Sequence, residues 1–338
     1  MTETKYITVS TSNPEDDVVA EAARILDNGG LVAFPTETVY GLAADAFNDS
    51  AIQKVFEAKG RPSDNPLIVH IAEASFVGSI SSSFPEIGWT LARTFWPGPL
   101  TVVVPKAERI SHLVTAGLDS VAVRMPNHPV ALSMIRRFGR GIVAPSANIS
   151  GRPSPTMALH VYDDLNGKVD LILDAGDTRI GVESTVLDIT QSPPVLLRKG
   201  GLSKEAIEAV IGDIDANPEG DALKRSPGLR HKHYAPRADV RLVRKGDSIG
   251  LGSLLEEADV VTKKVACVLH TIPDRAFSTN VSVRRVNSEA EQLSHVLFAL
   301  MRELDKEGIE LIVVEEVEEK GLGTAVMDRL RRAAAKEQ

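Results

Sequence analysis

One short segment of the chain brings cations, hydroxyls and amides together at a spacing that suits an anion site. Residues 59–70 read Lys-Gly-Arg-Pro-Ser-Asp-Asn-Pro-Leu-Ile-Val-His, and each proline fixes its own φ and biases the preceding residue away from helix. Lys59 and Arg61 therefore enter a stiff polar loop that can hold both cations toward an anion. Most such cation pairs are ordinary surface charges. This loop, however, leads into an apolar strand containing His70, and similar segments follow, so the pattern favours a phosphate or nucleotide site.

Three more loops repeat the design, at residues 35–41, 124–129 and 145–155. In each, an apolar stretch ends and a proline-stiffened loop presents hydroxyl, amide or cationic groups. Ligands of α/β folds commonly bind at strand ends. Four such loops that converge would form a cleft with cations and short polar donors.

Arg124 stands between a three-residue apolar stretch and Met125-Pro126, which predicts a partly buried guanidinium that needs an anion. A carboxylate held through two parallel N–H groups is its natural ligand. An internal ion pair with one of the chain's acids is an equally good interpretation of the spacing. Both alternatives stay open at this point.

The hydroxyl and amide side chains of these loops have common structural uses. Ser146 and Asn148 could bind a ligand or cap the following turn, and capping is the more frequent use. Taken singly, most of four others would be ordinary strand-end hydroxyls: Thr36, Thr38, Ser184 and Thr185.

Histidine and cysteine usage argues against a zinc enzyme. A lone histidine such as His70 near the end of an apolar strand is usually a satisfied core residue. His231 and His233 face one way on an extended chain without an evident third ligand, and Cys267 is the only cysteine. No GxxxxGK[ST], GxGxxG or GxSxG motif occurs, so the usual phosphate loops would not bind a nucleotide here. We expect no metal site built from protein side chains.

Length and composition are those of an ordinary globular protein of two domains. The chain has 338 residues, 43% hydrophobic and 25% charged, with a net charge of −8. This charge argues against a broad nucleic-acid coat, although a local basic patch stays compatible with it. No apolar run reaches the length of a membrane span, and the N-terminus lacks the basic-then-apolar order of a signal peptide. We expect a cytoplasmic monomer.

Apolar periodicity predicts strands that alternate with helices, and hence a mostly parallel α/β sheet. Strands are expected at 31–34, 67–71, 100–104, 121–123, 142–143, 171–173, 184–189, 195–198, 239–243, 265–270, 281–286 and 309–314. Helices are expected at 14–28 with Asn13 as N-cap, 51–58, 89–95, 128–138, 203–211, 248–258, 289–306 and 321–335. Between residues 212 and about 237 the pattern lapses into polar, proline-rich sequence, which predicts an interdomain linker.

Six ordered segments closely resemble the YrdC-type threonylcarbamoyl-AMP synthases: 34–42, 59–70, 96–101, 123–126, 144–148 and 184–188. The His-Lys-His-Tyr-Ala-Pro segment at 231–236 and the α/β pattern after it resemble the long, two-domain form of that family. The resemblance is strong over residues 7–236 and architectural beyond. It implies an α/β protein with a YrdC-like domain of twisted mixed sheet and helices at 1–212. A linker that closes over the active site would follow at 213–237, and a smaller Rossmann-like α/β domain at 238–338.

The resemblance also implies a reaction, in which L-threonine, bicarbonate and ATP with Mg²⁺ give threonylcarbamoyl-AMP and pyrophosphate. A downstream transferase complex would use the product to make threonylcarbamoyladenosine in tRNA, with at most a weak contact between tRNA and this chain. Lys59 and Arg61 match the family's catalytic, phosphate-binding cations. The positions that match ATP contacts are Arg61, Asn65, Ser120, Ser146, Asn148, Ser154, Arg198 and Tyr234. Those that match threonine contacts are Thr38, His70, Arg124 and Ser184.

Three alternatives follow from the same residues. A related carbamoyl-adenylate domain of hydrogenase-maturation proteins carries zinc-binding cysteine clusters, which a single cysteine rules out. An RNA-binding module without ATP turnover would suit a basic cleft, but the net charge of −8 and a content of two tryptophans and four tyrosines weigh against a stacking platform. The third alternative is a separate nucleotide-regulatory site in residues 237–338, where no motif supports or excludes it.

Overall fold

The computed structural model describes residues 3–218, 234–257, 263–273, 280–287 and 289–335. The chain divides into two compact units, an N-terminal unit of Met1–Ser150 with Ser154–His231 and a C-terminal unit of Gly151–Pro153 with Lys232–Gln338. One boundary of this division falls within residues 213–237, the expected linker, whereas Gly151–Pro153 is grouped with the C-terminal unit although it lies inside the expected catalytic domain. Residues 219–233, with His231 and His233, lie outside the described residues, so a linker that closes over a site stays a prediction.

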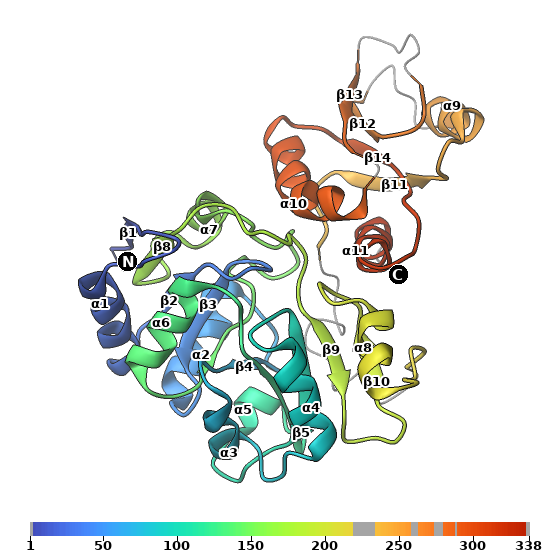
Figure 1. The fold of residues 1–338 in the computed structure, drawn as a ribbon. Helices are drawn as coiled ribbons and strands as arrows, with labels where there is room; N and C mark the ends of the chain where they lie inside the picture. Colours follow the sequence, from blue (N-terminus) through green and yellow to red (C-terminus); the bar gives the residue numbers. More distant parts are fainter. Residues whose placement is uncertain (1–2, 219–233, 258–262, 274–279, 288, 336–338) are drawn as a thin grey trace. The chain divides into compact units, whose positions relative to one another are not determined.

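Ten strands form the sheet of the N-terminal unit (Figure 1), in the order β1-β8-β2-β3-β7-β4-β6-β5-β9-β10. Their bounds are β1 Lys5–Thr8, β2 Val32–Phe34, β3 Gly41–Asp45, β4 Ile68–His70, β5 Leu100–Pro105, β6 Ser120–Arg124, β7 Ile142–Val143, β8 Leu171–Asp174, β9 Thr185–Asp188 and β10 Val195–Arg198. Four neighbouring pairs are parallel and five antiparallel, so the sheet is mixed, as the family resemblance implies. The expectation of a mostly parallel sheet is wrong for this unit. Parallel neighbours need a crossover connection, which is usually helical, but five neighbouring pairs here run in opposite directions.

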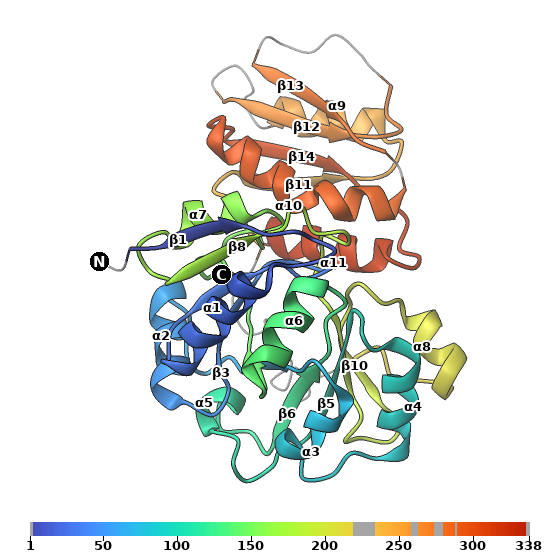
Figure 2. The ribbon, with the colours of Figure 1, turned by 60° about the vertical axis from the view of Figure 1, so that its left-hand side comes forward.

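Helices cover both faces of this sheet, and side-chain alternation along the strands explains why. Val32 and Phe34 pack with α1 (Asp16–Asp27) and α6 (Pro129–Phe138), which lie side by side in Figure 2. Ala33 faces the larger core on the other side. The remaining helical segments are α2 Asp49–Lys59, η1 Ala74–Phe76, α3 Val77–Ile80, α4 Glu86–Phe95, α5 His112–Thr115, α7 Ala158–Leu165 and α8 Lys204–Ile211.

Some elements of this unit differ from the sequence prediction. The sequence did not predict strands β1 and β3 or the helical segments η1, α3, α5 and α7. The two alanines within β3 explain its weak signal, since alanine has low β-propensity. Helix α1 has Glu15 as its N-cap rather than Asn13. The expected N-cap is wrong because Pro14 does not start the helix, which begins at Asp16.

The C-terminal unit has a four-stranded sheet of order β11-β14-β12-β13, with every pair parallel. Figure 2 shows these strands side by side in that order. The strands are β11 Asp239–Val243, β12 Val265–Leu269, β13 Val281–Arg285 and β14 Leu311–Glu315, and the helices are α9 Ser248–Glu257, α10 Ala290–Lys306 and α11 Gly323–Ala334. This is the small parallel α/β domain that the sequence predicts. No helix in the described part of the chain is long and apolar enough to cross a membrane.

Glu315 ties together three loops at the carboxyl edge of this second sheet. Its fully buried carboxylate accepts hydrogen bonds from the backbone N–H groups of Gly246, His270, Thr271 and Ile272 and from the Thr271 hydroxyl. Burial by itself raises the pKa of Glu315, but these donors outweigh it and lower the pKa to about 2. The carboxylate therefore acts as a structural anchor of the domain.

Candidate active site

Strand register in the N-terminal unit places polar side chains in one row across the sheet. His70 of β4 pairs with Arg124 of β6, and Arg124 pairs with Thr101 of β5. Thr101 in turn pairs with Val186 of β9, and Val186 with Arg198 of β10. Residues directly paired on neighbouring strands share a face of the sheet. The row therefore collects two arginines, a histidine and a hydroxyl together with Val186. Val186 also belongs to an apolar cluster with Ile68, Val103, Ala122, Val195 and Leu197.

A β-bulge brings Arg198 into this row. Leu196 pairs with Leu187, but the next pair joins Arg198 to Val186, so Leu197 is the extra residue. Without the bulge Leu197 would occupy the position opposite Val186. The guanidinium of Arg198 donates to the backbone carbonyl of Ser184 (3.1 and 2.9 Å) and to its hydroxyl (3.1 Å).

Ser184 connects the two halves of the row. Its hydroxyl lies 2.8 Å from the hydroxyl of Thr101, and both side chains are buried. A Cβ at Gly200 would lie 2.3 Å from the carbonyl carbon of Ser184, so only glycine lets the chain after β10 pass this close. The hydroxyl of Ser184 is thereby fixed between Thr101 and Arg198.

Arg124 forms a buried ion pair with Glu37, a residue of the loop that follows β2. Nη2 of Arg124 lies 2.7 Å from Oε2 of Glu37, without the alignment of a full hydrogen bond, and the two side chains are 5% and 2% exposed. Nε of Arg124 donates to the carbonyl of Gly98 at 3.3 Å. Of the two readings of Arg124 that the sequence left open, the internal ion pair is therefore present, and a substrate carboxylate on the same guanidinium stays a prediction.

His70 is buried and neutral. Burial, helped by the positive charge of Arg124, lowers the pKa of His70 to about 3, although the contact with the carbonyl of Ile68 opposes the shift. Nδ1 lies 3.3 Å from that carbonyl oxygen, which can only accept, so Nδ1 carries the proton and Nε2 presents a lone pair. His70 is thus a hydrogen-bond acceptor beside Arg124.

The loop after β2 also orients Thr38. The hydroxyl of Thr36 donates to the carbonyl of Val39 at 2.7 Å and lies 2.8 Å from the hydroxyl of Thr38. Because the one proton of Thr36 is used on Val39, Thr38 is the donor in that contact and keeps its own lone pairs as acceptors. The carbonyls of Glu37 and Thr38 accept from the N–H groups of Ile180 and Gly181, which fixes this loop against the segment that leads to Ser184.

Lys59 is the last residue of helix α2, not part of the following loop as the sequence predicted, and its side chain reaches the loop of residues 145–155. The residue is 2% exposed, and its ammonium donates to the carbonyl of Ser146 and, at 2.6 Å, to that of Asn148. The carbonyl of Lys59 accepts from the N–H of Ser150 at 2.8 Å. The sequence predicted a direct phosphate contact for Lys59; the structure gives it a role in shaping the loop of Ser146 and Asn148, and the phosphate contact stays a prediction.

Other predicted ATP residues lie in the same two loops or next to Ser184. The guanidinium of Arg61 donates to the carbonyls of Asn65 (3.3 Å) and Pro66 (3.0 Å), and Asn65 is fully buried. The hydroxyl of Ser154 donates to the carboxylate of Glu183, the residue before Ser184. These bonds connect the 145–155 loop to the polar row.

Two predicted ATP residues lie apart from these contacts. Ser120 begins β6, four residues before Arg124 and roughly 13 Å from it along the strand. Tyr234 belongs to the C-terminal unit, where its ring stacks on Phe298 at 5.5 Å and lies under Arg329 at 4.8 Å. No described contact joins either residue to the row, so their ATP roles stay predictions.

Three buried residues of this site were missed from the sequence: Glu37, Thr101 and Glu183. Each lies within or directly beside a segment that carries the family resemblance. A signal existed for Glu37, since a carboxylate between two threonines just after an apolar strand needs a cation, and Arg124 needs an anion. Matching the buried carboxylate with the buried guanidinium would have predicted the ion pair of Glu37 and Arg124.

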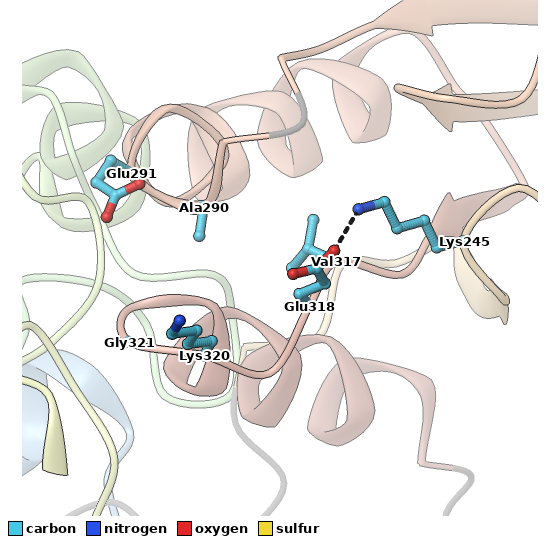
Figure 3. Close-up of a pocket in the computed structure, with 7 residues that line it drawn as sticks. All are labelled: Lys245, Ala290, Glu291, Val317, Glu318, Lys320 and Gly321. Atoms are coloured by element: carbon cyan, nitrogen blue, oxygen red, sulfur yellow. Dashed lines mark hydrogen bonds and ion pairs between the residues drawn. The ribbon is translucent and has the colours of Figure 1, made fainter. Parts of the chain in front are cut away.

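A separate hollow of about 450 Å³ lies in the C-terminal unit and contains none of the predicted site residues. Figure 3 shows its lining, where Lys245 pairs with Glu318 at 2.8 Å and Lys320 and Glu291 lie on the side away from Lys245. Its charges are balanced, and nothing in it indicates a ligand. Within the described ranges, no group of three or more His, Cys, Asp or Glu side chains could hold a metal ion.

Two family models match the chain. Residues 24–200 match the Sua5_yciO_yrdC model, described as telomere recombination. Residues 202–335 match the Sua5_C model, described as the C-terminal domain of threonylcarbamoyl-AMP synthase. Together the two models span both structural units.

Similar proteins and structures cover nearly the whole chain. A Pyrococcus abyssi protein named threonylcarbamoyl-AMP synthase is 48% identical over 93% of this chain and 93% of its own length. A Bacillus subtilis protein of the same name is 44% identical over 96% and 94%. The crystal structure of P. abyssi Sua5 complexed with L-threonine superposes with a TM-score of 0.91 at 46% identity, covering 97% of each chain.

Proposed function

The chain belongs to the threonylcarbamoyl-AMP synthase family, and on this premise we propose that it joins L-threonine, bicarbonate and ATP into threonylcarbamoyl-AMP and pyrophosphate. The observation that carries the proposal is the polar row. Of the four residues predicted to hold threonine, His70 and Arg124 are paired neighbours, and Ser184 contacts Thr101 of the same row. The fourth, Thr38, belongs to the loop whose Glu37 contacts Arg124.

Each of these side chains suits one part of an α-amino acid that carries a hydroxyl. The guanidinium of Arg124 suits the carboxylate. Nε2 of His70 and Oγ1 of Thr38 are buried acceptors, and they suit donors such as the side-chain hydroxyl. A site built to hydrogen-bond that hydroxyl should reject valine strongly, because the buried acceptors would be left unpaired.

The reaction needs positioning and charge stabilisation more than acid–base chemistry. The amine of threonine and bicarbonate form a carbamate with loss of water, and a carbamate oxygen then attacks the α-phosphate of ATP while pyrophosphate leaves. We propose that Arg61, Asn65, Ser120, Ser146, Asn148, Ser154, Arg198 and Tyr234 bind ATP, with Lys59 and Arg61 toward its phosphates. The buried bonds from Lys59 support this, because they fix the loop of Ser146 and Asn148 before substrate arrives. The chain would then be a nucleotidyltransferase.

We propose that Mg²⁺ reaches this site with the phosphates of ATP. The described residues offer no cluster of acidic, histidine or cysteine ligands for it. Magnesium commonly binds through substrate phosphates with few protein ligands, and there it would neutralise charge on the triphosphate. The setting we propose is a cytoplasmic monomer that passes its product to a tRNA-modifying transferase complex.

The experiment that tests the proposal measures pyrophosphate release from ATP, with threonine and bicarbonate each left out in turn. Release that needs both substrates supports the proposal. Release that is indifferent to both contradicts it. Salt-dependent tRNA binding without ATP turnover would favour the RNA-binding alternative.

A further inference from the structure

Glu37 is a buried carboxylate with one oxygen in an ion pair and the other without a hydrogen bond. Its side chain is 2% exposed, and Oε2 faces Arg124. Oε1 accepts no hydrogen bond from any residue that the structure describes. A buried, unpaired carboxylate oxygen is costly, so such an oxygen commonly marks a place for a donor that arrives with a ligand.

The surroundings of Glu37 restrict what that donor can be. His128 lies close enough for the charge of Glu37 to raise its pKa, yet burial dominates and lowers the pKa of His128 below its usual value. Nδ1 of His128 is used as an acceptor from the N–H of Val130, where it caps α6. Among the described residues, Arg124 is the cation that forms an ion pair with Glu37, and its Nη2 faces Oε2.

Arg124 and Glu37 together present a positive and a negative group side by side. A free carboxylate ligand would satisfy Arg124 and leave Oε1 of Glu37 unpaired. A zwitterionic α-amino acid offers a carboxylate for the guanidinium and an ammonium for the carboxylate, so each buried charge meets its opposite.

We propose that Glu37 receives the α-ammonium of threonine and thereby selects an amino acid over a hydroxy acid at the site of Arg124. The inference rests on the proposed function and assigns a role to a residue outside the predicted threonine set. Because Glu37 also contacts Arg124, it sets the spacing between the two subsites. The carboxylate lies in the segment between the apolar strand β2 and Gly41, where its backbone is held by Ile180.

The experiment compares two ligands on two proteins by calorimetry. The ligands are L-threonine and (2S,3R)-2,3-dihydroxybutyrate, which replaces the ammonium by a hydroxyl and keeps the carboxylate and side chain. In the wild-type chain, threonine should bind about 10- to 100-fold more tightly, the range expected for a hydrogen bond to a charged group. In Glu37→Gln this preference should disappear, because threonine affinity falls while the affinity for the hydroxy acid is retained.

Structural damage would give a different pattern. A misplaced Arg124 weakens both ligands equally, so equal losses in Glu37→Gln would overturn the inference, as would equal affinity of the two ligands for the wild-type chain. Glu73→Gln is the matched control, since Glu73 pairs with Arg136 on the surface of the same unit and should leave both affinities unchanged. If Glu37→Gln does not fold, Glu37→Asp keeps the counter-charge of Arg124 and should still lose affinity for threonine alone; equal losses there would also overturn the inference.

Failure of the proposed function is a distinct result. A wild-type chain that binds neither ligand and releases no pyrophosphate contradicts the proposed function itself. A chain that turns over threonine but keeps its preference in both Glu37 variants contradicts only the role of Glu37.

Discussion

Nη2 of Arg124 lies 2.7 Å from Oε2 of Glu37, and both side chains are almost completely buried in the N-terminal unit. A charged pair at this depth is expensive to desolvate and adds little net stability compared with apolar packing. The buried position of this pair is therefore better explained by a role in ligand binding than by a contribution to the stability of the fold. This view gives Arg124 and its neighbours testable roles.

Arg124→Lys should weaken threonine binding more than it impairs folding. Lysine keeps the positive charge for Glu37 but loses the planar fork that holds a carboxylate through two parallel bonds. We expect the KM for threonine to rise by roughly tenfold or more, with a smaller change in the KM for ATP. Initial rates against each substrate measure this. Arg136→Lys, at an exposed ion pair, is the control, and equal changes of both constants in Arg124→Lys would argue against a carboxylate subsite.

Lys59→Met should disrupt the 145–155 loop. The change removes the donors to the carbonyls of Ser146 and Asn148 and leaves both acceptors buried, which should destabilise the N-terminal unit by roughly 2–4 kcal/mol. ATP affinity should fall with it. Lys54→Met is a matched control on the same helix, because Lys54 is an exposed residue that donates through a part-buried bond to the carbonyl of Gly29. Thermal unfolding and calorimetric titration with ATP check both effects, and a variant with native stability and ATP affinity would contradict the assignment.

His70 makes the N-terminal unit sensitive to acid. Its folded pKa of about 3 lies below the usual value of 6.5, so between these values the unfolded chain binds one more proton than the folded one. Stability from this group is complete above pH 6.5 and falls as the pH drops, at up to about 1.4 kcal/mol per pH unit. His70→Gln should lose less stability than the wild type between pH 7 and pH 4.5. Denaturant unfolding at both pH values measures the difference, and identical losses would show that His70 is not buried as a neutral ring.

Glu315→Gln should loosen the C-terminal unit. An amide in place of the carboxylate keeps one acceptor oxygen, so its NH₂ group must face either the N–H of Gly246, on Oε1, or the N–H groups of His270 and Ile272, on Oε2. Hydrogen exchange should become much faster at the backbone amides that lose their acceptor, while exchange in the β4 and β6 strands stays unchanged. Because the folded pKa of Glu315 is about 2, its stabilising effect is present above pH 4.5 and is lost as the pH falls toward 2. Glu310→Gln is the control, since Glu310 accepts one exposed bond from Lys264.

Much of the fold follows from the sequence because its elements have strong local signals. Helix α6 is a clear case, with His128 before Pro129, apolar residues at helical spacing and Gly139 after the end. Sheet direction is not encoded in this way. Strands β2 and β3 pair antiparallel through a loop without a turn motif, and the pairing depends on long-range contacts such as that between the N–H of Leu42 and the carbonyl of Pro145.

The site could be predicted in part, for a related physical reason. Arg124 and His70 stand out singly, since a cation or a histidine at the end of an apolar strand is unusual. That His70 lies opposite Arg124 depends on how strands β4 and β6 align, and a single sequence does not determine this register. Arg198 reaches the row only through a one-residue bulge, and Thr101 looks like any threonine of a strand.

The most direct test of whether this chain makes threonylcarbamoyl-AMP follows the labelled carbon of bicarbonate into the product. The chain is incubated with ATP, Mg²⁺, L-threonine and ¹³C-bicarbonate, and the products are analysed by mass spectrometry. We expect threonylcarbamoyl-AMP that carries the label, formed together with pyrophosphate and absent when threonine is replaced by valine. ATP consumption without a labelled adenylate, or a labelled adenylate formed equally well from valine, would contradict this expectation.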